Sequence, residues 1–309
     1  MLMRRVFLYL SHAKWARALV TRFFMARRMA RRFVAGETLQ EALVATKALN
    51  NAGLLVTLDY LGESVTSAQE TEAVRQTYLD LLENIHKQGL NASVSLKLTH
   101  MGLDISQALC IANVRHILTL AKQHNIPVTI DMEGSAYTDI TLQVYKTLRD
   151  DYEYGALIGT VIQSMLRRSV ADTHQLAEEG ARIRLVKGAY LEPEALAYPL
   201  KADVDKAYVD IMRDYFAYAP SAYLELGTHD EKMIASAIQL AKEAGVDNHH
   251  YEIQMLYGIR RERQTELANA GVQMRVYVPF GEAWYPYFMR RLAERPANVW
   301  FLTRSLFSK

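Results

Sequence analysis

The chain has 309 residues, of which 50% are hydrophobic and 23% are charged, which is a composition typical of folded globular domains. A chain of this length suits one large α/β domain or two small ones, and it can bury a core without disulfides or metal. The single cysteine, Cys110, excludes an internal disulfide framework, and the net charge of +2 gives no reason to expect nucleic acid as a partner. No apolar run reaches the roughly 18 residues that a transmembrane helix needs.

The first segment in chain order, residues 1–32, is basic and amphipathic. It contains nine Lys or Arg residues and no Asp or Glu, with apolar residues such as Phe7, Trp15 and Phe23 between them. Three interpretations are open: a helical arm packed on the domain, a surface that contacts anionic lipid headgroups, and an arginine-rich transit peptide. Residues 1–50 are predicted to form a helical arm, and residues 51–309 a catalytic domain.

From residue 54 onward, short apolar runs alternate with longer helical patterns. The runs are rich in Val, Ile, Leu and Tyr, as buried parallel strands are, and they cover residues 54–60, 92–98, 127–133, 156–163, 182–188, 222–228, 250–256 and 272–278. Helical patterns such as 68–89 and 232–245 lie between them. The alternation predicts a distorted (β/α)8 barrel of the TIM type with an N-terminal helical extension. An open doubly wound sheet is the alternative, but neither standard glycine-rich nucleotide motif is present.

Polar side chains gather at the carboxyl ends of these strands, where such barrels carry their sites. In chain order they are Asp59 and Glu63, Lys97, Asp131 and Glu133, Gln163, Arg184 and Lys187, Thr228 and His229, and Tyr277. Charged residues within apolar strands are costly to bury unless they pair. They therefore form either a polar plug in the barrel or a site at one rim, and their number at one rim favours the site.

Strand alternation constrains two cations of the predicted fifth strand, Arg184 and Lys187. In "RLVKG", Arg184 and Lys187 project from opposite faces, so one of them acts at the strand end, near the turn at Gly188. The last helical pattern, which follows a predicted turn at Pro279 and Gly281, carries another pair, Arg290 and Arg291. Arginine forks bind carboxylates in bidentate fashion, so this pair is a candidate carboxylate clamp. Two solvated surface arginines are the alternative on periodicity alone.

Eight ordered blocks closely resemble proline dehydrogenase in its bacterial single-function form: "DYLGE", "SLKLTHMGLD", "IDMEGSAYTD", "VIQSMLRRS", "RLVKGAY", "LGTHD", "YEIQMLYG" and "YPYFMRRLAE". The resemblance runs from about residue 33 to the end. It implies a distorted barrel that holds FAD noncovalently at the carboxyl ends of its strands. It also implies oxidation of L-proline to Δ1-pyrroline-5-carboxylate, with hydride transfer from C5 to flavin N5 and electrons passed to a membrane quinone.

The resemblance also implies roles for individual residues. Asp131 and Arg184 are implied as catalytic residues, and substrate binding is implied for Lys97, Tyr277, Tyr287, Arg290, Arg291, Leu256 and Glu63, the last as a partner of Arg290. Contacts with FAD are implied for Met132, Gln163, Lys187, Gly188, Ala189, Thr228, His229 and Gln254. No metal is expected. Gly134 departs from the family pattern, which has an acidic residue there.

Other functions remain open from the residues alone. A class I aldolase or transaldolase would use Lys97 or Lys187 as a Schiff-base lysine, and a metal-dependent barrel would use His229, His249 and His250, although the last two are expected to face opposite ways on a strand. A pure proline-binding module is the third alternative. The expected location is the cytoplasm, with peripheral contact of residues 1–32 with the inner face of the cell membrane.

Overall fold

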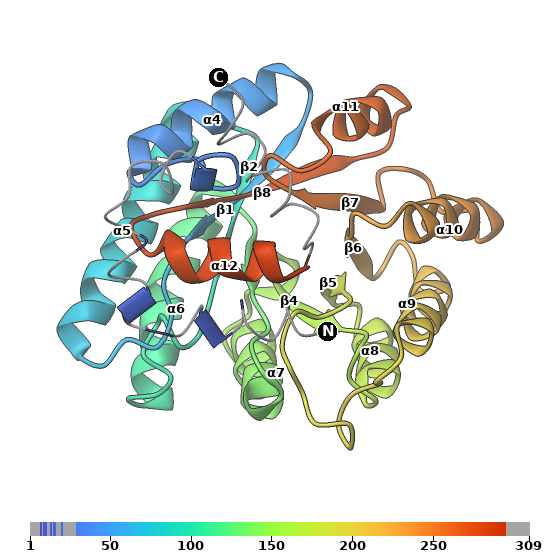
Figure 1. The fold of residues 1–309 in the computed structure, drawn as a ribbon, viewed down its shortest axis with the longest axis horizontal. Coiled ribbons are helices and arrows are strands. Elements are labelled where there is room, and N and C mark those ends of the chain that lie inside the picture. Colours follow the sequence, from blue (N-terminus) through green and yellow to red (C-terminus); the bar gives the residue numbers. More distant parts are fainter. Residues whose placement is uncertain are drawn as a thin grey trace.

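The computed structural model describes residues 7, 9, 10, 13, 15, 16, 20 and 29–294. Eight parallel strands close into a barrel in chain order (Figure 1). They are β1 (Leu55–Tyr60), β2 (Ala92–Leu96), β3 (Val128–Ile130), β4 (Ile158–Gln163), β5 (Arg182–Val186), β6 (Tyr223–Gly227), β7 (Tyr251–Leu256) and β8 (Met274–Phe280). The barrel closes where β1 pairs with β8 along its whole length. The predicted fold is confirmed.

Helices form a ring outside the strands (Figure 1). They are α4 (Leu39–Asn51), α5 (Ala68–Lys87), α6 (Gln107–His124), α7 (Thr138–Lys146), α8 (Ser169–Glu178), α9 (Lys201–Phe216), α10 (Glu231–Glu243) and α11 (Arg261–Asn269). Local sequence explains where several begin. Thr38 and Glu41 form a reciprocal capping box at the start of α4, and the Ser67 side chain accepts from the Glu70 backbone N–H at the start of α5.

The core consists of side chains from both faces of the strands together with the inner faces of the helices. Leu58, Leu96 and Ile130 are completely buried, as are Leu81 and Leu82 of α5. Burying each such side chain stabilises the fold by about 1.5–3 kcal/mol relative to leaving it in water. The same core includes Ala42 and Leu43 of α4, which belong to the predicted helical arm. The boundary at residue 50 stays a prediction.

The end of β8 differs from the sequence-based expectation. Pro279 was predicted to turn the chain, but β8 continues through Phe280, and Pro279 pairs in register with Asp59 of β1. Although proline has no backbone N–H, its carbonyl accepts a hydrogen bond from the Ala35 backbone at 2.9 Å. The chain turns at Gly281, whose φ of +119° lies in the region that favours glycine.

The last described helix, α12 (Trp284–Glu294), lies across the mouth of the barrel (Figure 1). Its residues Trp284 and Phe288 pack in a separate apolar cluster that includes Phe33 and Ala16 of the N-terminal segment. The Tyr285 hydroxyl donates to the backbone carbonyl of Leu10 at 3.0 Å. The N-terminal segment thus helps to hold α12 over the strand ends. No helix of the described residues is both long and apolar enough to cross a bilayer.

Candidate active site

A cavity of about 490 Å³ lies at the carboxyl ends of the strands, bordered by α12. Every site residue predicted from the sequence lines it except Glu63: Lys97, Asp131, Met132, Gln163, Arg184, Lys187, Gly188, Ala189, Thr228, His229, Gln254, Leu256, Tyr277, Tyr287, Arg290 and Arg291. Glu63 lies beside the cavity and accepts a hydrogen bond from Arg290 at 3.2 Å. The structure therefore brings the predicted residues together, while their roles stay predictions.

Lys97 is a buried ammonium group between two carboxylates. Its Nζ lies 3.4 Å from Asp59 Oδ2 and 4.0 Å from Asp131 Oδ2. Burial lowers the pKa of Lys97, but the charges of Asp59 and Asp131 outweigh burial, and the net shift is upward. Lys97 therefore remains a fixed cation in the cavity wall.

Asp131 is the hub of the hydrogen bonds on this wall. It accepts from the Tyr277 hydroxyl at 2.6 Å, from Ser95 Oγ at 2.7 Å and from Arg184 Nη1 at 2.7 Å. Burial raises the pKa of Tyr277 well above its ordinary value, and the Asp131 charge raises it further. Tyr277 therefore stays a neutral donor, and its orientation is set by Asp131.

Arg184 and Lys187 occupy different places, as strand alternation predicted. Arg184 is buried within the strand, whereas Lys187 lies beyond the strand end, next to Gly188 with its φ of +107°. Lys187 Nζ contacts Asp205 at 2.5 Å and Asp230 at 2.7 Å. These carboxylates fix the ammonium group at the rim of the cavity.

The two arginines of α12 both border the cavity. The helical periodicity alone leaves two solvated surface arginines as an alternative to this position. Arg290 pairs with Glu63; burial lowers the pKa of Arg290, but Glu63, Tyr190 and Asp59 together raise it above its ordinary value. The Arg291 guanidinium carbon lies 5.0 Å from the centre of the Tyr287 ring, a cation–π distance. One cation is thus held by a carboxylate and the other by an aromatic face.

Two buried polar atoms show how the wall could receive a flavin. Within the described residues, Arg184 Nη2 and Gln254 Oε1 make no hydrogen bond, although both residues line the cavity. Buried polar groups are rarely left without a partner, and a bound group that carries both an acceptor and a donor would satisfy this donor and this acceptor. The polar edge of an isoalloxazine carries carbonyl oxygens and an N–H, so the residues present fit this group.

Sequence reasoning missed some of the residues around the cavity. Asp59 was noted at the end of the first strand but not assigned to the site, and it lines the cavity beside Lys97. Tyr190 also lines the cavity, and burial raises its pKa to about 12. The polarity of Asp59 within an apolar strand was the signal that could have found it. No local pattern marks Tyr190, because its place depends on the path of the β5–α9 loop.

His229, His249 and His250 do not converge. His249 and His250 were predicted to lie on a strand, but both precede β7, and His250 pairs with Asp247 at 3.0 Å. They therefore lie at the amino end of β7, whereas His229 follows the carboxyl end of β6 and accepts from the Leu256 backbone N–H through Nε2. Within the described part of the chain, no group of three or more His, Cys, Asp or Glu residues is placed to hold a metal ion.

A second hollow, of about 680 Å³, lies next to α11 and is lined by Arg32, Gly258, Arg260, Arg261, Glu262, Arg263 and Glu266. Two of its arginines have glutamate partners: Arg260 and Arg263 contact Glu231 at 2.7 and 2.5 Å, and Arg263 also contacts Glu266 at 3.0 Å. This hollow is lined by arginines, glutamates and a glycine, without the aromatic rings and amide side chains that line the cavity at the strand ends.

Comparison with known proteins decides the family. A family model described as proline dehydrogenase matches residues 42–304. Proline dehydrogenase 1 of Bacillus subtilis (strain 168) is 41% identical over 312 residues, which is 100% of each chain. Proline dehydrogenase of Deinococcus radiodurans is 39% identical over 282 residues, which is 90% of each. The chain belongs to the proline dehydrogenase family.

Solved structures place this family member on the same fold. The crystal structure of proline utilization A (PutA) from Bdellovibrio bacteriovorus inactivated by N-propargylglycine matches with a TM-score of 0.82 and 25% identity, over 91% of this chain and 34% of that one. The chain thus corresponds to one part of PutA, whereas it matches the Bacillus subtilis relative along its whole length. The resemblance to single-function proline dehydrogenases is confirmed.

His100, which lies just beyond Lys97, gives this family member a testable pH dependence. Its ring stacks on Tyr60 at 5.5 Å, and burial, followed by the Lys97 charge, lowers its pKa from 6.5 to about 4. The unfolded chain therefore binds more protons between these values, so stability falls as the pH falls from 6.5 toward 4. Between pH 7 and pH 5 the loss is expected to be about 2 kcal/mol, since one pKa unit corresponds to about 1.4 kcal/mol.

Urea unfolding at pH 7 and pH 5 measures this dependence in the wild type and in His100→Gln, which cannot titrate. The loss in free energy of unfolding between pH 7 and pH 5 is expected to be smaller in the variant than in the wild type by about 2 kcal/mol. An equal loss of stability in both proteins would show that His100 is not buried in its neutral form.

Proposed function

We propose that the chain oxidises L-proline to Δ1-pyrroline-5-carboxylate in proline catabolism, with noncovalent FAD as the acceptor within the cavity. Family membership supports the activity. One observation supports the substrate: three cations, Lys97, Arg290 and Arg291, border the same cavity as the aromatic rings of Tyr277 and Tyr287. A cluster of cations beside apolar surface suits a small ring that carries a carboxylate.

The cations bind and orient the substrate. Arg290, Arg291 and Lys97 would neutralise the carboxylate and hold the proline ring in one position, with Leu256, Tyr277 and Tyr287 packed around it. The same positive charge disfavours the protonated form of the ring nitrogen and lowers its pKa. This matters because the nitrogen lone pair must be free when hydride leaves C5.

The other side of the cavity would hold the cofactor. The residues proposed for this task are Met132, Gln163, Lys187, Gly188, Ala189, Thr228, His229 and Gln254. When bound, the flavin supplies a two-electron acceptor for the hydride at its N5. Arg184 contributes a permanent positive charge to the wall, which favours a reduced, anionic cofactor.

The electrostatics of the lysines disfavour the aldolase alternative. A Schiff base forms from a neutral amine, but Asp59 and Asp131 keep Lys97 protonated. Lys187 is held by Asp205 and Asp230. Each lysine is paired with two carboxylates, which supports an electrostatic role for both.

We further propose that the electrons pass to a membrane quinone and that the N-terminal segment touches the inner face of the cell membrane. Most of residues 1–32 lie outside the described residues. Of those described, Tyr9 and Trp15 are 67% and 62% exposed, and aromatic side chains of this kind favour the membrane interface. The double variant Tyr9→Ser/Trp15→Ser is expected to bind anionic liposomes more weakly.

Flotation with anionic liposomes measures that binding, and proline oxidation with a water-soluble acceptor serves as the control. The variant keeps the buried Ala16, which packs in the cluster with α12, so the control activity is expected to match the wild type. Wild-type flotation by the double variant would contradict membrane contact through these two residues.

The proposed activity is tested by incubating the purified chain with FAD, L-proline and a soluble quinone. Formation of Δ1-pyrroline-5-carboxylate is expected, and it requires both FAD and proline. Omission of FAD from the apoprotein is the control. Product formation that persists without any flavin would contradict the proposed chemistry.

A further inference from the structure

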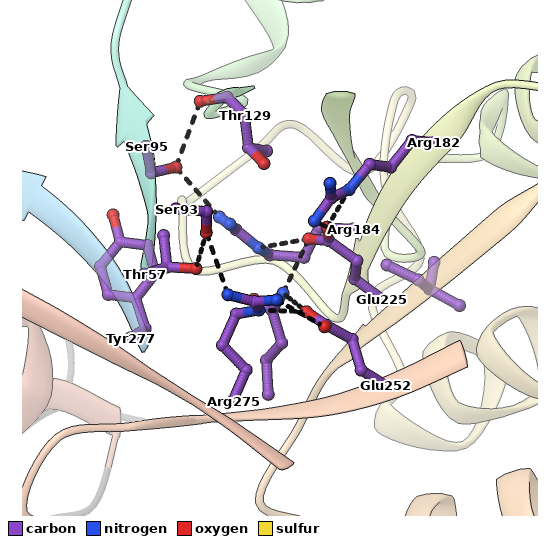
Figure 2. Close-up of polar contacts among 12 residues, drawn as sticks. Thr57, Ser93, Ser95, Thr129, Arg182, Arg184, Glu225, Glu252, Arg275 and Tyr277 are labelled. Carbon is purple, nitrogen blue, oxygen red and sulfur yellow. Dashed lines mark hydrogen bonds and ion pairs between the residues drawn. The ribbon is translucent and has the colours of Figure 1, made fainter. Parts of the chain in front are cut away.

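Beneath the cavity, the barrel interior holds a buried network of opposite charges that the proposed reaction does not use. Arg182, Glu225, Glu252 and Arg275 belong to it, and Arg184 joins it to the cavity (Figure 2). Arg275 donates to both oxygens of Glu252 at 2.6 and 2.9 Å. Of these residues only Arg184 lines the cavity.

Glu225 is held rigidly within this network. Arg182 contacts its Oε1 at 2.5 Å, and Gln254 Nε2 donates to its Oε2 at 2.7 Å. Burial alone would raise the pKa of Glu225, but Arg182, Arg184 and Arg275 lower it to about 2. Its carboxylate is therefore ionised and unable to rotate without breaking a charged contact.

Glu225 and Asp131 hold two different edges of the Arg184 guanidinium. Nε lies 3.4 Å from Glu225 Oε2, and Nη1 donates to Ser95 at 3.2 Å (Figure 2). Nη1 also donates to Asp131 at 2.7 Å. The Tyr277 ring lies at 5.2 Å from the guanidinium carbon. A planar group fixed at two edges can turn in neither direction, so the position of its third nitrogen, Nη2, is also determined.

Neither Nε nor Nη2 of Arg184 makes a hydrogen bond within the described residues, but Nε forms the ion pair with Glu225, which leaves Nη2 for another partner. We propose that Glu225 is a positioning residue of the active site, which fixes the plane of Arg184 so that Nη2 is kept for the cofactor. This inference rests on the proposed flavin chemistry. Asp131 and Ser95 cannot do this alone, because both contact Nη1 and leave the guanidinium free to tilt about that atom.

The network offers a matched control. Glu225→Gln and Glu252→Gln each replace a fully buried carboxylate with an amide of the same shape, and both side chains accept from Gln254. Glu225 contacts Arg184, whereas Glu252 pairs with Arg275. A purely structural contribution would affect the two variants alike.

Two readouts separate the roles: the Kd of FAD for the apoprotein, and kcat and KM for L-proline at saturating FAD. For Glu225→Gln we expect a Kd about tenfold higher and a kcat about tenfold lower, with KM within about twofold, since the proposed carboxylate clamp does not touch Glu225. For Glu252→Gln we expect Kd and kcat within about twofold of the wild type. Both variants are expected to show a similar decrease in Tm.

If Glu225→Gln does not fold, the double variant Arg182→Met/Glu225→Gln replaces it. It removes one cation and one anion that pair with each other, so the buried charge stays balanced, and it is expected to show the same defect in FAD binding. Equal effects of the Glu225 and Glu252 substitutions on Kd and kcat would overturn the positioning role, as would wild-type values in the double variant. A wild-type chain that binds no FAD would overturn both this inference and the proposed function, whereas tight binding by both wild type and Glu225→Gln would overturn only the inference.

Discussion

Arg291→Met is expected to raise the KM for L-proline by about 30- to 100-fold. A charge-assisted hydrogen bond between guanidinium and carboxylate contributes about 2–3 kcal/mol when it is buried, and each 1.4 kcal/mol is about a factor of ten. Methionine retains most of the apolar stem that packs near Tyr287, so the variant removes charge and hydrogen bonding more than volume. Steady-state kinetics over a wide range of proline concentration measures the effect.

Arg263→Met is the matched control for this substitution. Arg263 lies on α11, pairs with Glu231 and Glu266 and does not line the cavity at the strand ends. Its loss is expected to leave KM unchanged. If Arg291→Met also left the KM for proline unchanged, Arg291 would not belong to a carboxylate clamp.

Asp131→Asn is expected to lower kcat/KM for proline by about 100-fold or more and to destabilise the fold by about 3 kcal/mol, the size of effect seen when one partner of a buried ion pair is removed. The carboxylate accepts from Tyr277, Ser95 and Arg184 at once. An amide has one accepting oxygen and a donating NH₂ group, which would face at least one of these donors. The positions of Arg184 and Tyr277 would therefore change together.

Chemical denaturation and steady-state kinetics separate the two effects, and Glu133→Gln serves as the control. Glu133 is also buried and accepts from the Thr99 backbone and hydroxyl, but it does not line the cavity. Its substitution is expected to lower stability while changing kcat/KM by less than about threefold. A similar loss of kcat/KM in both variants would indicate that Asp131 acts through stability alone.

The barrel could be predicted from the sequence because each strand is a short apolar run and each helix a longer amphipathic pattern. All eight predicted runs contain the observed strands or most of them. The end of β8 could not be predicted, because proline within a strand is tolerated only when the neighbouring chain makes its hydrogen bonds elsewhere. The contacts that hold Pro279 in the strand come from residues distant in sequence: Pro279 lies beside Asp59 of β1, and its carbonyl accepts from the Ala35 backbone N–H.

The residues of the candidate site could be predicted from the sequence for a related reason. Parallel strands bring their carboxyl ends to one rim, so residues such as Lys97, Asp131 and Arg184 were expected to meet there. The charged network beneath the rim could not be predicted from the sequence. Arg182, Glu225 and Arg275 lie within strands and could each have faced a helix or the barrel interior, and only the register between β5, β6, β7 and β8 brings them together.

Anaerobic addition of L-proline to the FAD-loaded chain tests the central claim most directly. The visible absorption of the bound flavin is expected to bleach with one equivalent of proline per flavin, and the Arg291→Met variant is expected to require far more proline for the same bleaching. A chain that holds FAD and binds proline while the flavin stays oxidised would contradict the account.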